Sequence, residues 1–99
     1  MTNLDYKKIV TDYQDDFLKD LFELLSIPSV REDDKATEEF PVGPGPAKAL
    51  QKFLEFGERD GFEVKNFDNW AGHIEFGSGD ELFGILGHVD VVPVGTGWE

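Results

Sequence analysis

The sequence predicts an α/β fold, and three features of its hydrophobic pattern support that prediction. Apolar residues recur at helical spacing over residues 9–25, and a second helical pattern covers residues 46–61. Two short segments, 62–65 and 73–76, alternate apolar with polar side chains, as strands with one covered face do, and Asp68 and Asn69 are expected to turn the chain between them. A third segment, 82–86, is apolar throughout, which is typical of an interior strand covered on both faces. We therefore expect two helices followed by about three strands.

The first helix is predicted to bury one broad face. It should end near Ser26, because Pro28 lacks an amide hydrogen and disfavours helical geometry at Ile27. Most of the other positions of the helix are acidic, as expected for a solvated face. The apolar positions that form the buried face are Ile9, Val10, Tyr13, Phe17, Leu18, Leu21, Phe22, Leu24 and Leu25.

The second helix follows a polar segment rich in proline and glycine, residues 29–46, which is expected to be a long loop of either functional or plain surface character. Pro46 suits the first position of the helix and Gly61 suits its C-cap. Gly57 interrupts the helix at a cost of about 1 kcal/mol relative to alanine. It is therefore predicted to permit close packing against a neighbour, as part of a buried stripe that also contains Leu50, Phe53 and Leu54.

Length and composition limit the function classes. The 99 residues, 39% of them hydrophobic, predict one folding unit over positions 1–99. A net charge of -12 argues against nucleic acid and acidic membranes as partners, because their phosphates would be repelled. The sequence contains no cysteine, and its first residues lack the apolar stretch of a signal peptide. We therefore expect a cytoplasmic protein.

The residues best suited to chemistry are His88 and Asp90, which follow the apolar run 82–86. Side chains two positions apart on a strand point to the same side, so the imidazole and the carboxylate should lie together. Taken alone, this pair is weak evidence, because a histidine at a strand end is more often a hydrogen-bonded structural residue than a metal ligand. The residues around the pair favour a metal ligand over a structural histidine.

The segment from Gly87 to Pro93, followed by Gly95, Gly97 and Trp98, resembles the first metal-ligand motif of the M20 family of metallopeptidases. The resemblance extends over essentially the whole chain and is greatest to the bacterial dipeptidase V branch, a group of Xaa-His dipeptidases similar to carnosinase. Further segments that carry it are the two N-terminal helices, 38–43, 53–62 and the hairpin around 69–72. It covers only the start of the family's polypeptide.

The resemblance implies the N-terminal part of a zinc-peptidase-like α/β/α catalytic domain. It also implies that His88 is a ligand of one of two active-site zinc ions and that Asp90 orients His88 and raises its basicity. In the family, paired metals activate a water that a glutamate deprotonates for attack on the peptide bond. The other ligands and the glutamate have no counterpart in residues 1–99. The expected function is therefore that of an N-terminal fragment of a zinc-dependent dipeptidase that hydrolyses short peptides with a free N-terminus.

The fragment alone is expected to be inactive, because the remainder of the catalytic domain and a lid domain are missing. His73 is interpreted as an ordinary edge histidine, and the acidic run 32–34 as solvated, because it lacks the spacing of a calcium loop. The alternative hypothesis is a self-standing acidic α/β module that binds a protein partner without catalysis. The apolar run 82–86 argues against that alternative, because it would leave an unpaired sheet edge.

Overall fold

The computed structural model describes residues 3–98; Met1, Thr2 and Glu99, which belong to the predicted unit 1–99, lie outside the described residues. The elements follow in the order α1 (Tyr6–Asp12), α2 (Gln14–Leu25), a short 3-10 turn (Asp33–Lys35), α3 (Pro44–Arg59), β1 (Glu63–Phe67) and β2 (Ala71–Glu75). The fold is thus a small mixed α/β arrangement of three helices and a two-stranded antiparallel hairpin. No helix within residues 3–98 combines the length and the apolar character needed to cross a membrane.

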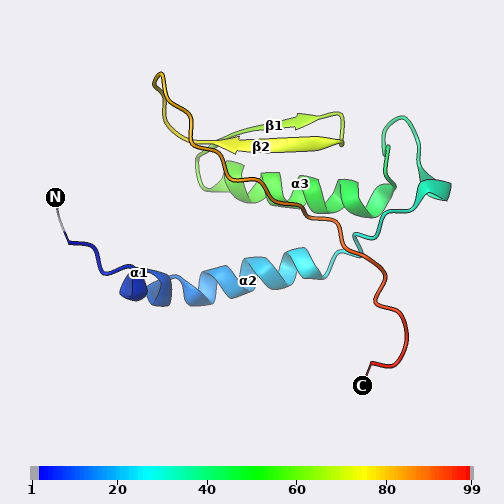
Figure 1. Cartoon of the computed structure of the whole chain (residues 1–99), viewed down its shortest axis with the longest axis horizontal. Helices are drawn as coiled ribbons and strands as arrows, with labels where there is room; N and C mark the ends of the chain where they lie inside the picture. The colour runs from blue at the N-terminus through cyan, green and yellow to red at the C-terminus, as the bar shows by residue number, and fades with distance from the viewer. Residues whose placement is uncertain (1–2, 99) are drawn as a thin grey trace.

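Helix α3 is the central layer. The β1–β2 hairpin lies along one side of it and α2 along the other, as Figure 1 shows. The buried side chains belong mainly to α3, and Leu54 is only 7% exposed. The packing therefore consists of one helix held between a hairpin and a second helix.

Helix α3 begins at Pro44 rather than at the predicted Pro46. Of its predicted buried stripe, Leu54 is buried, whereas Phe53 is 43% exposed. Gly61 adopts a φ of 89° just after the helix, which suits a glycine at this end. Gly57 is buried against β2, where an added Cβ would lie 2.8 Å from Cδ1 of Ile74. The prediction that Gly57 permits close packing is therefore confirmed.

The N-terminal helix differs from its prediction in two ways. The helical segment is interrupted at Tyr13, after which Asp15 and Asp16 occupy the first turn of α2, where carboxylates favour the positive end of the helix dipole. The predicted broad buried face is wrong, because α1 and α2 contain no buried residue and Phe17, for example, is 61% exposed. The physical reason is that α3 contacts α2 along one side, while no described element covers the remaining apolar side chains.

The hairpin has the predicted turn. Asp68 and Asn69 have φ values of 56° and 63°, left-handed geometry that Asp and Asn tolerate better than other non-glycine residues. The strands pair with Val64 opposite Ile74. The Nδ2 of Asn69 also donates to the carbonyl oxygen of Glu39 at 2.8 Å, which attaches the preceding loop to the hairpin.

The predicted third strand is absent from the described residues. The segment 82–86 has neither helix nor strand, and its side chains reach 100% exposure at Leu86. An interior strand requires hydrogen-bonding neighbours and two covering layers, and residues 3–98 supply neither along this segment. The structure therefore has two strands instead of the expected three.

Candidate metal centre

His88 and Asp90 lie together in the structure, as their spacing predicts. The Nδ1 of His88 is 3.1 Å from the Oδ1 of Asp90 and 3.0 Å from its carbonyl oxygen. Both side chains are accessible, with 82% of the histidine and 52% of the aspartate exposed. The two residues are two positions apart, and neither lies in a strand.

The two oxygens near Nδ1 determine which ring nitrogen can bind a metal. An ionised carboxylate and a carbonyl oxygen can only accept a hydrogen bond, so Nδ1 must donate and carry the proton. In the neutral imidazole, Nε2 then has the free lone pair that a metal ligand needs. This arrangement of a carboxylate behind a histidine is typical of zinc sites in proteins.

The backbone next to the pair is attached to the loop that follows α2. The amide of Val91 donates to the carbonyl oxygen of Ser29 at 3.2 Å, and Val30 and Val91 form an isolated parallel bridge. Ser29 is only 4% exposed, whereas most of the segment 77–98 is exposed. In the same loop, the pKa of Arg31 is raised chiefly by its hydrogen bond to Asp33, with a smaller electrostatic contribution from Asp90.

The potential metal ligands among the described residues do not form a cluster. Within residues 3–98, no group of three or more His, Cys, Asp and Glu side chains is placed to hold a metal ion. His73 lies on the hairpin, with its ring packed edge-on against Phe67 at 5.5 Å between centroids. A protein zinc site generally has three or four protein ligands. His88 and Asp90 therefore fit a ligand and its orienting carboxylate, and further ligands would have to come from outside this set.

Two side chains of the acidic run 32–34 form ion pairs with nearby basic residues. Arg31 contacts Asp33 at 2.7 Å, and Lys35 contacts Glu32 at 2.8 Å. These side chains are exposed to a large degree, so the pairs are solvated. The prediction of a solvated acidic run is confirmed for Asp33, whose side chain is 74% exposed.

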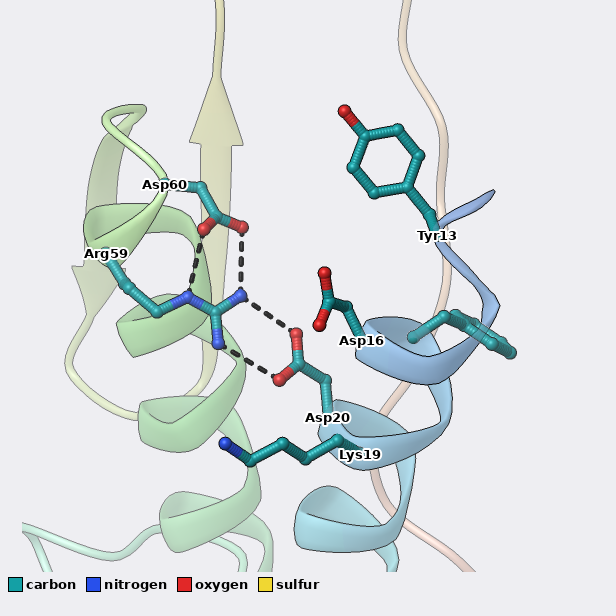
Figure 2. A pocket seen from close by; sticks show the side chains of 7 residues that line it. Tyr13, Asp16, Lys19, Asp20, Arg59 and Asp60 are labelled. Atoms are coloured by element: carbon teal, nitrogen blue, oxygen red, sulfur yellow. Dashed lines mark hydrogen bonds and ion pairs between the residues drawn. The ribbon is translucent and has the colours of Figure 1, made fainter. Parts of the chain in front are cut away.

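A second polar cluster was not predicted from the sequence. Arg59 at the end of α3 donates two hydrogen bonds to Asp20 of α2, at 3.0 and 2.8 Å, and two more to its neighbour Asp60 (Figure 2). The hydrogen bonds from Arg59 hold the pKa values of Asp20 and Asp60 below their usual range. An open cleft next to the cluster is lined in addition by Tyr13 and Phe17. The cluster links α2 to α3, and no local spacing signals it because the partners are 39 positions apart.

Comparison with known proteins places the chain among bacterial dipeptidase sequences, to which it is homologous over nearly its whole length. It is 51% identical over 96 residues to the beta-Ala-Xaa dipeptidase of Lactobacillus delbrueckii subsp. lactis, covering 97% of this chain and 20% of that protein. It is 59% identical over 90 residues to a protein of Staphylococcus saprophyticus named "Putative dipeptidase", covering 91% of this chain and 19% of that protein. A Staphylococcus aureus protein with the same description is 52% identical over 94 residues, covering 95% and 20%.

The chain thus spans about a fifth of the length of these curated relatives. A scan against protein-family models finds none that matches it.

Proposed function

We propose that this chain is the N-terminal piece of a zinc-dependent dipeptidase that hydrolyses short peptides with a free N-terminus. The observation that carries the proposal is the 51% identity, over 97% of the chain, to a protein named beta-Ala-Xaa dipeptidase. The contact between Nδ1 of His88 and Oδ1 of Asp90 supports it, because it leaves Nε2 available to a metal. The alternative of an acidic interaction module has only the net charge in its favour.

In the proposed enzyme, His88 binds one of two zinc ions through Nε2, and Asp90 holds the proton on Nδ1. When bound, the paired ions supply Lewis acidity and lower the pKa of a water molecule. Asp90 fixes the ring orientation and keeps the imidazole in the tautomer that can bind metal. The chain's own contribution to catalysis is thus to hold one ligand in the correct protonation state and direction.

The remaining ligands and the general base would come from the rest of the catalytic domain, and a lid domain would complete the substrate site. The exposed run 82–86 supports this part of the proposal. Leu82, Phe83 and Ile85 are 88%, 88% and 91% exposed, an apolar surface that a strand neighbour and covering helices would bury. We therefore propose that the 99 residues alone are inactive.

The proposed setting is the cytoplasm, with short peptides as the substrate. The charge of -12 supports a role that involves neither nucleic acid nor an acidic membrane surface.

A chimera provides the test. The matching segment of the Lactobacillus dipeptidase is replaced by this chain, and hydrolysis of a beta-alanyl dipeptide is measured with bound zinc determined by atomic absorption. We expect an active chimera, loss of activity and of bound zinc in His88→Ala, and little change in the matched control His73→Ala. A chimera that folds and binds zinc but has no activity, or an equally active His88→Ala variant, would refute the proposal.

A further inference from the structure

We propose that Gly45 is a positioning residue for the His88–Asp90 pair, acting through the backbone of Pro28 and Ser29. The inference rests on the proposed function, because it assigns to Gly45 a part in holding the metal-binding pair. Gly45 lies far from the pair in sequence and in a different element, the first turn of α3.

The first step is the close approach of α3 to the loop that follows α2. A Cβ added to Gly45 would clash with the carbonyl oxygen of Pro28 and would lie 3.3 Å from the Cα of Ser29. Both of these are backbone atoms that no rotamer change can move. Any residue larger than glycine must therefore displace the backbone on one side of the contact.

The side that moves is the loop. Gly45 is flanked by Pro44 and Pro46, whose rings fix φ near helical values, and Pro46 and Ala47 are buried. Pro28 and Ser29 lie outside any helix or strand, so a shift there disrupts no regular element. An alanine at position 45 would push Pro28 and Ser29 away from α3.

The second step carries this displacement to the candidate metal centre. The carbonyl of Ser29 accepts the hydrogen bond from the amide of Val91, and Val30 pairs with Val91 in the parallel bridge. Val91 is the chain neighbour of Asp90, whose carboxylate and carbonyl oxygens both contact Nδ1 of His88. Moving Ser29 therefore removes the restraint on the backbone that directs Asp90 toward the ring.

Gly45→Ala is the decisive variant, and Gly72→Ala is its matched control. Gly72 lies in β2, and its added Cβ would also meet neighbours, at 2.9 Å from Cδ1 of Leu54 and from the carbonyl oxygen of Lys65. Both variants thus introduce the same methyl group into a tight contact. Only the first contact adjoins the loop that holds Val91.

The first readouts use the 99-residue chain: hydrogen exchange at the Val91 amide, and the tautomer of neutral His88 from the nitrogen chemical shifts of its ring. We expect Gly45→Ala to abolish any protection of Val91 and to convert the Nδ1–H form into a mixture. We expect Gly72→Ala to leave both unchanged when compared at equal stability. Val91→Pro, which removes the donor itself, should reproduce the mixture if Gly45→Ala fails to fold, while Val92→Pro should not.

The second readout is the zinc affinity of the chimera described above, measured by competition with a chromophoric chelator. We expect about a tenfold or greater loss in Gly45→Ala, the range found for groups that orient metal ligands. An unchanged tautomer and unchanged zinc affinity in Gly45→Ala would overturn the inference, as would equal effects of Gly72→Ala. If the unmodified chimera binds no zinc, the proposed function fails, while the exchange and tautomer readouts still decide whether Gly45 positions the pair.

Discussion

Replacing Gly57 by alanine brings two effects of opposite sign into competition. Alanine in a helix interior is favoured over glycine by about 1 kcal/mol. The added methyl group, however, would meet Cδ1, Cγ1 and Cγ2 of Ile74 at 2.8, 2.9 and 2.9 Å. Only Cδ1 can move away by rotation about χ2, so Ile74 or the β2 backbone has to shift.

Overpacking of this kind costs about 1–3 kcal/mol. Subtracting the gain in helix propensity leaves an expected net loss of about 1 kcal/mol in the free energy of unfolding. Ile74→Ala removes all three contacting atoms, so in that background Gly57→Ala should instead stabilise the chain by about 1 kcal/mol. The effect of Gly57→Ala on the free energy of unfolding therefore changes sign between the two backgrounds.

The assay is urea denaturation followed by far-UV circular dichroism for the four chains of this double-mutant cycle. All four are measured in one concentration of a stabilising osmolyte, because Ile74→Ala itself costs stability. If Gly57→Ala raises the unfolding free energy equally in both backgrounds, α3 and β2 do not approach as closely as described. The packing argument would then be wrong.

Three further predictions follow from the core, the ion pairs and the metal site. Leu54→Ala should cost about 2–5 kcal/mol in urea denaturation, against less than about 1 kcal/mol for Leu25→Ala, because the two leucines are 7% and 62% exposed; equal losses would contradict the assigned core. The pKa of Asp20 is lower in the folded chain than its unfolded value of about 3.9. Ionised Asp20 therefore stabilises the fold at pH values above about 3.9, and this stabilisation is lost as the pH falls through the lower pKa of the folded chain. Between neutral pH and pH 2, the free energy of unfolding of Asp20→Asn should thus fall less than that of the unmodified chain. If the unfolding free energies of the two chains fall in parallel with pH, the ion pair with Arg59 does not contribute. In the 99-residue chain, zinc should bind more weakly than about micromolar, because residues 3–98 place no group of three ligands around a metal ion; a fluorescence titration showing tighter binding that depends on His88 would disprove this.

Features that depend on neighbouring residues agree well between the sequence and the structure. The turn at Asp68 and Asn69 and the end of α3 before Gly61 both follow from local backbone preference. The end of α2 near Ser26 was also predicted, because Pro28 acts on the residue directly before it. Such features need no information about distant parts of the chain.

Features that depend on a partner element agree less well. The apolar pattern of 9–25 and 82–86 indicates surfaces that need covering, yet within residues 3–98 these surfaces stay largely exposed. Hydrophobic periodicity indicates that one face of an element is apolar, but that face is buried only if a second element packs against it. The homologous dipeptidases are about five times as long, which is where we propose the covering elements to lie.

The sequence by itself determined the α/β character, the C-terminal ends of α2 and α3 and the hairpin turn, because each arises from interactions within a few residues. Only the tertiary structure decided that Arg59 joins Asp20, that Gly45 adjoins Pro28, and that Val91 bonds to Ser29. Each of these contacts joins segments distant in sequence, whose meeting depends on how loops close and helices pack. Local preferences specify the elements, and packing specifies which of them meet.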